Sequence, residues 1–97
     1  MKLRFTPRAT QDLVDIADYI REGSPNASLR VRAAILDSLQ DIVLFPEAGR
    51  RQTVEGVRKF VSRKYSYLIY YGLDQSTDEI IILTIQHSAR EREYEDA

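Results

Sequence analysis

The residues of this chain that are best suited to chemistry come directly after an aliphatic run. Ile80–Ile85 is apolar at every position but one, and His87 and Arg90 follow it closely. A strand that turns polar in this way has left the core, so we expect His87 and Arg90 at an edge that a partner can reach. An imidazole there can take up or release a proton near neutral pH, and a guanidinium can bind a phosphate.

Cleavage of an RNA strand is one chemistry that such residues could perform. The 2′-hydroxyl must lose a proton, the leaving 5′-oxygen must gain one, and the charge on the phosphate must be stabilised. The candidates are His87 as acid or base, Arg58, Arg63 and Arg90 at the phosphate, and Tyr94 for proton transfer or base stacking. The structural alternative is that His87, at a strand end, only hydrogen-bonds a backbone carbonyl.

Composition excludes several other kinds of site. The chain has no cysteine, which rules out disulfides, thiolate zinc sites and cysteine nucleophiles. It has one histidine, and its carboxylates fall mainly on predicted helix faces or in the C-terminal tail, so no metal site is expected. Neither a glycine-flanked serine nor a glycine-rich phosphate loop occurs. We therefore expect no metal and no cofactor.

The charge is balanced overall but locally uneven. Fourteen basic and fifteen acidic residues give a net charge of −1, whereas a protein that binds mainly through phosphates is usually clearly basic. The stretch from Arg50 to Lys64 nevertheless holds six basic residues and one acid, Glu55. Such a local patch on a neutral protein favours a protein partner over bulk nucleic-acid binding. Alternatively, Arg58 and Lys59 guard an exposed strand against edge pairing.

A helical hairpin is predicted in the N-terminal half, after a short strand at Lys2–Phe5. Thr6-Pro7 and Ser24-Pro25 are each a capping residue followed by a proline, which is the pattern that opens a helix. Gly23 is expected to stop the first helix, and Phe45-Pro46 the second. Because the connection between the helices is very short, they must be antiparallel neighbours.

Helical spacing assigns the faces of these helices. Apolar residues recur on one side of each, and in the first helix Asp12, Asp15 and Asp18 are expected on the opposite, solvent face. The second helix has a wide apolar stripe, which predicts a groove between the hairpin and the sheet that a partner helix could fill. The positions expected in that groove are Leu29, Val31, Ile35 and Leu39.

The C-terminal half has the period of strands. Three are predicted near Val57–Ser62, Tyr67–Leu73 and Glu79–His87, joined by short polar connections. The last residues, 89–97, are expected to be a frayed helix or disordered. The chain is thus predicted to be a single α+β domain, 1–97, of order β-α-α-β-β-β, with the helical hairpin packed on one face of a small, mainly antiparallel sheet.

The ordered set of short motifs along the chain resembles the RelE/ParE toxins of bacterial type II toxin–antitoxin systems, and most closely the ParE-like branch. The motifs are Phe5-Thr6-Pro7-x-Ala9-x-x-Asp12-Leu13-x-x-Ile16-x-x-Tyr19-Ile20, Pro46-x-x-Gly49-Arg50, Gly56-Val57-Arg58, Tyr67-x-Ile69-x-Tyr71 and His87-x-x-Arg90. They cover nearly the whole chain. None is specific alone, so the resemblance rests on their order and spacing.

The resemblance implies a sheet curled around a concave face and a cognate, ParD-like antitoxin that binds the toxin tightly. ParE-like members poison DNA gyrase and are not known as enzymes, whereas RelE-like members cut mRNA on the ribosome. Gyrase inhibition is the favoured expectation, because the second strong acid or base that nuclease relatives place on the central strands is missing. A non-toxic interaction module is a third possibility. The lack of cysteine and of an apolar signal region suits a cytoplasmic protein.

Two sets of contact residues are expected on this basis. The target would be contacted by Arg58, Arg63, His87 and Arg90. Arg58 is expected to approach His87 and Arg90 from a neighbouring strand. The antitoxin would be contacted by the apolar groove positions named above and by the basic residues Arg50, Arg51 and Lys59. DNA would be bound only indirectly, through the antitoxin.

Overall fold

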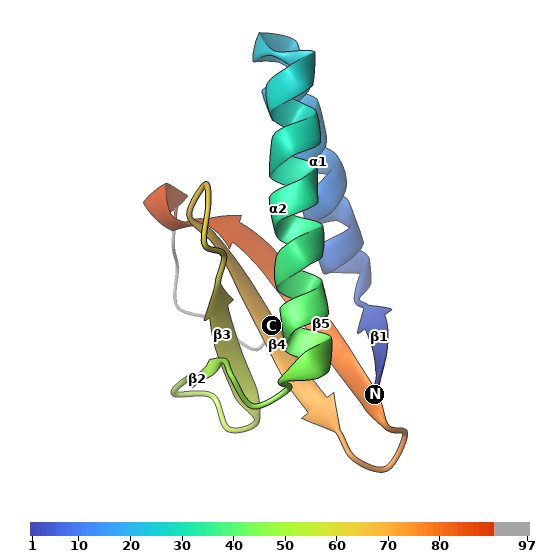
Figure 1. The fold of residues 1–97 in the computed structure, drawn as a ribbon. Helices are drawn as coiled ribbons and strands as arrows, with labels where there is room; N and C mark the ends of the chain where they lie inside the picture. The colour runs from blue at the N-terminus through green and yellow to red at the C-terminus, as the bar shows by residue number, and fades with distance from the viewer. Residues whose placement is uncertain (91–97) are drawn as a thin grey trace.

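The computed structural model describes residues 1–90, which form a sheet of five strands with two long helices on one face (Figure 1). The elements are β1 (Lys2–Phe5), α1 (Pro7–Gly23), α2 (Pro25–Leu44), β2 (Arg50–Arg51), β3 (Val57–Val61), β4 (Tyr67–Asp74), β5 (Glu79–His87) and a 3-10 turn, Ser88–Arg90. The predicted α+β fold is confirmed, with β2 as an additional short strand that the sequence did not indicate.

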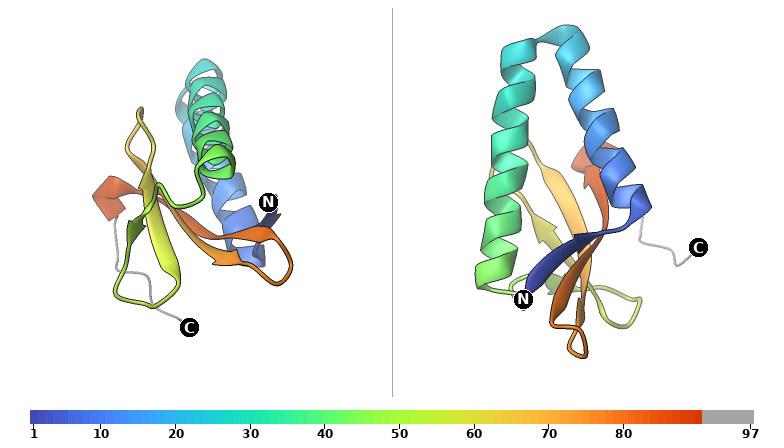
Figure 2. Two further views of the ribbon diagram at one scale, coloured as in Figure 1. Left: turned by 60° about the horizontal axis from the view of Figure 1, so that its bottom comes forward. Right: turned by 90° about the vertical axis from the view of Figure 1, so that its right-hand side faces the viewer.

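Both predicted helix starts are confirmed. The hydroxyl of Thr6 accepts a hydrogen bond from the amide of Ala9 (3.1 Å), and that of Ser24 accepts one from the amide of Ala27 (3.2 Å). Ser24 also ends α1, so one residue closes the first helix and opens the second. The helices therefore lie side by side, and their joined ends project beyond the sheet (Figure 2). Neither helix within residues 1–90 has an apolar stretch that could cross a membrane.

The sheet is mainly antiparallel, as predicted. Its strand order is β1-β5-β4-β3-β2, with only the β1–β5 pair parallel. Side chains alternate along β4: Tyr67, Ile69 and Tyr71 pack beneath the helices, whereas Leu68 and Tyr70 join Val57 in a second cluster. All three tyrosines of β4 are buried. The central strand thus contributes to hydrophobic clusters on both of its faces.

A bulge in β5 explains why Asp12 points inward. The pairing of β5 with β4 shifts at Leu83, and β1 covers only the first half of β5. The carboxylate of Asp12 accepts hydrogen bonds from the hydroxyl of Thr84 (2.6 Å) and the amide of Ile85 (3.0 Å), while the Thr6 hydroxyl donates to the carbonyl of Leu83 (2.9 Å). The prediction that Asp12 lies on the solvent face of α1 is therefore wrong.

Candidate functional site

His87 lies at the exposed end of β5, as predicted. Its ring contacts Tyr67 edge-to-face at 5.2 Å between centroids, and its Nδ1 accepts a hydrogen bond from the amide of Ala89 (3.1 Å). The bond is therefore to a backbone amide, and not to the carbonyl that the structural alternative envisaged. With Nδ1 as an acceptor, a neutral imidazole carries its proton on Nε2. The ring is held in place on the protein and remains accessible.

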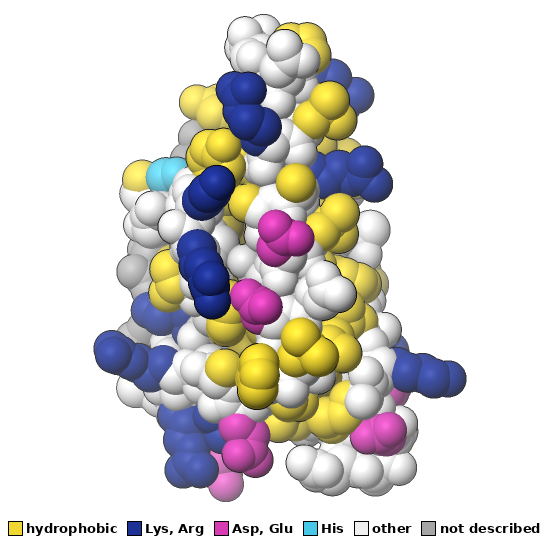
Figure 3. All heavy atoms as spheres, viewed as in Figure 1, with side chains coloured by type: hydrophobic (Ala, Val, Ile, Leu, Met, Phe, Trp, Pro, Cys, Tyr) yellow, Lys and Arg dark blue, Asp and Glu magenta, His cyan; other side chains and the backbone are white. Residues whose placement is uncertain are grey.

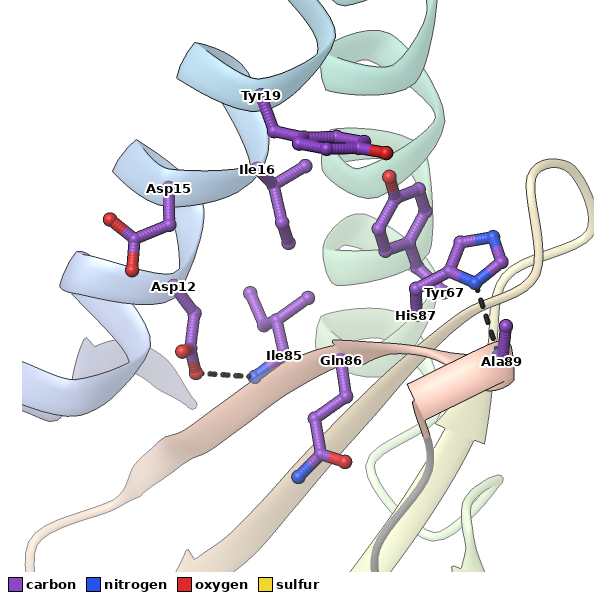
Figure 4. A pocket seen from close by; sticks show the side chains of 9 residues that line it. All are labelled: Asp12, Asp15, Ile16, Tyr19, Tyr67, Ile85, Gln86, His87 and Ala89. Atoms are coloured by element: carbon purple, nitrogen blue, oxygen red, sulfur yellow. Dashed lines mark hydrogen bonds between the residues drawn. The ribbon is translucent and has the colours of Figure 1, made fainter.

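A cleft of about 490 Å³, here called the His87 cleft, lies beside this ring between α1 and the end of β5 (Figure 4). It is lined by Asp12, Asp15, Ile16, Tyr19, Tyr67, Ile85, Gln86, His87 and Ala89. Since Asp12 is bound to β5, Asp15 is the carboxylate that remains open to the cleft. No Lys or Arg side chain among residues 1–89 lines it. That part of the chain provides a proton-transfer group here, but no cation for a phosphate.

Arg58 does not join His87, so the prediction that Arg58 completes a cluster with His87 and Arg90 is wrong. Arg58 is paired with Tyr71 on β4, whereas His87 is paired with Tyr67, four residues away on that strand. At about 3.3 Å per residue this separates the two by roughly 13 Å along the strands. Strand β4 also lies between them.

Arg58 instead helps to hold the connection that follows α2. Its guanidinium donates hydrogen bonds to the carbonyls of Glu47 (3.0 Å) and Gly49 (2.9 Å). The hydroxyl of Tyr71 donates to the carbonyl of Pro46 (2.7 Å) and accepts from the amide of Gly49 (2.9 Å). We call these residues the loop clamp. Three of the motifs that carried the resemblance thus meet in one structural unit.

The loop clamp predicts a pH-dependent effect of Tyr71→Phe. At neutral pH the change leaves the Gly49 amide and the Pro46 carbonyl without their partner, at a cost of about 1–3 kcal/mol in the free energy of unfolding. Burial raises the pKa of Tyr71 above its usual 10.0. The unfolded chain therefore loses this proton first, and the contribution of Tyr71 is lost as pH rises above about 10.

Denaturant unfolding of both proteins between pH 7 and 11 measures this effect. We expect the stability difference between wild type and Tyr71→Phe to shrink at the alkaline end. A difference that stays constant across this range would contradict the assigned role of the hydroxyl.

The basic stretch divides into two separate groups. Arg50 and Arg51 are exposed on β2 and pair in register with Lys59 and Arg58 of β3. Arg63 and Lys64 lie instead in the turn between β3 and β4, alongside α2. In Figure 3 basic side chains gather along this flank of the molecule. The sequence indicated one basic patch. The structure has two, because β3 runs from the residues paired with β2 to the turn that carries Arg63 and Lys64.

The apolar groove lies between the two helices, not between the hairpin and the sheet as predicted. This interhelical groove has a volume of about 280 Å³. Val31 and Ile35, 5% and 2% exposed, are core residues at its floor, and Leu39 is buried without lining it. Leu29 is 63% exposed. Leu29 is therefore an accessible wall of a groove, though not of the predicted one, Val31 and Ile35 are buried beneath it, and the placement of Leu39 in a groove is wrong.

Two accessible groove residues were not predicted. Val14 on α1 and Leu36 on α2 are 47% and 50% exposed and line the interhelical groove. Leu36 is one of the apolar residues of the second helix, but an apolar stripe as wide as that one does not reveal which of its side chains stays outside the core. Val14 was not predicted because its neighbour Leu13 fits the helical spacing of the apolar face of the first helix, whereas Val14 does not.

The remaining predicted positions are placed only in part. Arg90 ends the 3-10 turn directly after His87, while Tyr94 and most of the predicted tail lie outside the described residues. Within residues 1–90, no cluster of three or more His, Asp or Glu side chains is arranged to hold a metal ion.

Several known proteins similar to this chain are named as toxins. A model of the family described as "ParE toxin of type II toxin-antitoxin system, parDE" matches residues 3–92. The chain is 30% identical over 87 residues to the protein Y4kP of Sinorhizobium fredii, covering 90% of this chain and 88% of that protein. It is 33% identical over 86 residues to Toxin RelE2 of Caulobacter vibrioides, covering 89% and 93%.

A solved structure agrees with these matches. A chain in the chromosomal ParDE toxin–antitoxin system from P. aeruginosa superposes with a TM-score of 0.76 at 28% identity, covering 90% of this chain and 95% of that one. The match to the family model covers every helix and strand described above except for Lys2, the first residue of β1. This chain is thus a member of the ParE toxin family of type II toxin–antitoxin systems.

Proposed function

We propose that this toxin acts by binding DNA gyrase and that a ParD-like antitoxin neutralises it. The match to the ParE toxin family over residues 3–92 carries the proposal. The geometry supports action by binding rather than catalysis, because Arg58 is held in the loop clamp, far from His87. Both gyrase and the antitoxin would be met in the cytoplasm.

The antitoxin is proposed to lay an amphipathic helix in the interhelical groove. Val14, Leu29 and Leu36 offer apolar surface on both helices, and such exposed surfaces commonly mark partner sites. Arg50 and Arg51, exposed on β2, are candidates for additional charge contacts with this partner. Lys59 stands opposite Arg50 on β3 and belongs to the same basic edge.

The target is proposed to contact the end of the sheet where β5 finishes. His87, Arg90 and Arg63 come from this end, since the β3–β4 turn that carries Arg63 is tied to it: the amide of Ser88 donates to the carbonyl of Ser66 (2.8 Å). Arg58 leaves the target-contact set because its guanidinium serves the loop clamp.

Cleavage of mRNA on the ribosome is the second candidate function. The 33% identity to Toxin RelE2 and the accessible imidazole of His87 favour it. However, the His87 cleft has no cation from residues 1–89 to stabilise a phosphate. We rank it below gyrase binding for this reason.

Expression of the toxin without its antitoxin separates the candidates. A gyrase poison should produce filamentous cells with a DNA-damage response, while an mRNA endonuclease should stop translation within minutes. A chain that does neither would be a non-toxic interaction module on the same fold.

The variant His87→Gln tests the role of the imidazole. Glutamine keeps a hydrogen-bonding side chain at the strand end but cannot transfer protons. Under the gyrase proposal we expect His87→Gln, which keeps hydrogen bonding at the contact surface, to arrest growth within about twofold of wild type, measured as the inducer concentration that halves colony number. Loss of arrest in a variant that still binds purified gyrase and the antitoxin, with its melting temperature unchanged, would contradict the proposal and point to proton transfer.

A further inference from the structure

A second groove, of about 500 Å³, lies on the other flank of α2. We call it the α2–turn groove, because the turn between β3 and β4 forms its other wall. Its walls include Ala34, Asp37 and Asp41 from α2 and Arg63, Lys64 and Tyr65 from the turn. At about 100° per residue, this face of α2 points roughly opposite to the one that lines the interhelical groove. Two partners could therefore contact α2 at the same time.

The turn that forms one wall is fixed in a strained conformation. Tyr65 and Ser66 both have positive φ angles, 65° and 54°, and neither is a glycine. Such a conformation costs free energy and persists only where the surroundings enforce it, often at functional sites. Here the buried Ser62 enforces it: its hydroxyl donates to the carbonyl of Lys64 (2.6 Å) and accepts from the amide of Tyr67 (2.9 Å). The wall is therefore preformed before any partner arrives.

The groove carries charges of both signs. Arg63 and Lys64 stand on the turn, whereas the helix wall carries Asp37, Asp41 and one cation, Arg30. None of the ion pairs among residues 1–90 joins the two walls. Figure 3 shows acidic side chains on α2 beside basic side chains of the neighbouring flank. The carboxylates would repel a phosphate backbone in this space. A protein segment that carries both acidic and basic side chains is complementary to it.

We propose that the α2–turn groove binds a mixed-charge segment of the protein that the toxin inhibits. This rests on the proposed function, that of a toxin acting by binding a protein. The antitoxin helix is proposed to lie on the opposite face of α2, and the β3–β4 turn is hydrogen-bonded to the end of β5, where the target is proposed to bind. The groove therefore extends the target surface around this flank of the molecule.

Charge reversal on each wall tests the proposal in cells that express the toxin without antitoxin. We expect Lys64→Glu, and separately Asp37→Lys with Asp41→Lys, to require at least tenfold more inducer for the same growth arrest. Lys64 and Asp37 are exposed and Asp41 is partly so, so melting temperature and affinity for the purified antitoxin should not change. Arg8→Glu, at an exposed cation on α1, is the matched control and should arrest growth like wild type.

Each other result is decisive. If the groove bound nucleic acid, the variant with both Asp37→Lys and Asp41→Lys would become more toxic, because these changes make both walls of the groove basic. Unchanged toxicity of the wall variants, or an equal loss in Arg8→Glu, would also overturn the proposal. Loss of antitoxin affinity would assign the groove to the antitoxin instead. If the wild-type toxin arrests growth without affecting gyrase, the proposal that gyrase is the target is wrong. The proposal that the α2–turn groove binds the target is still tested by these variants.

Discussion

Replacing Leu36 with Glu should release the toxin from its antitoxin. Leu36 is half exposed on the wall of the interhelical groove, so the free toxin tolerates a charge there. In the complex a partner helix would bury the carboxylate beside Arg32, the cation that lines this groove, so the cost of desolvating the charge and the lost apolar contact both oppose binding. We expect the affinity for the antitoxin to fall at least about 100-fold, which corresponds to roughly 2.7 kcal/mol. Titration calorimetry measures it.

Leu44→Glu is the matched control for this change. Leu44 lies at the end of the same helix, is 64% exposed and does not line the groove. It should bind antitoxin like wild type, and co-expressed antitoxin should rescue cells from Leu44→Glu but not from Leu36→Glu. Equal affinities for both variants would show that the antitoxin helix lies elsewhere.

Gly49→Ala should have the largest effect on stability. A Cβ atom at Gly49 would lie 2.6 Å from the Tyr71 hydroxyl oxygen, well inside van der Waals contact. The ring is fully buried and cannot move aside without breaking its bonds to Pro46 and Gly49. We expect a loss of about 2–4 kcal/mol in the free energy of unfolding, from overpacking and lost hydrogen bonds together.

Gly23→Ala is the control for this substitution. No heavy atom lies within 4 Å of a Cβ placed at Gly23, the last residue of α1. Alanine should leave stability unchanged or raise it by up to about 1 kcal/mol, because it reduces the entropy of the unfolded chain. Denaturant unfolding of the two variants beside wild type provides the measurement. A Gly49→Ala protein as stable as Gly23→Ala would mean that the loop clamp is not rigid.

The elements of the fold could be predicted because their signals are local. The Thr6-Pro7 and Ser24-Pro25 pairs fix where helices begin, and Phe45-Pro46 fixes where the second ends. The change to strand-like periodicity after the helices located the three long strands. Strand β2 could not be predicted, because it has only two residues, neither of them apolar, and is defined only by its backbone pairing with β3.

The site was harder to predict because its contacts are long-range. Asp12 points inward because a bulge more than 70 residues later leaves an amide of β5 to be satisfied. Arg58 looked like a partner of His87, but which residues meet depends on strand register, and the register places Arg58 against the Pro46–Gly49 connection. The spacing of residues along the chain reveals neither the inward position of Asp12 nor the contact of Arg58 with this connection. The motifs of the resemblance did not show that several of their residues, among them Gly49, Arg58 and Tyr71, have a structural role.

The most direct measurement of the central proposal is a supercoiling assay with purified DNA gyrase and purified toxin. We expect the toxin to inhibit supercoiling in proportion to its concentration, and equimolar antitoxin to restore it. The same toxin should leave mRNA intact in a translation extract. Normal supercoiling at saturating toxin, together with cut mRNA in the extract, would contradict gyrase as the target and identify the chain as a ribosome-dependent endonuclease.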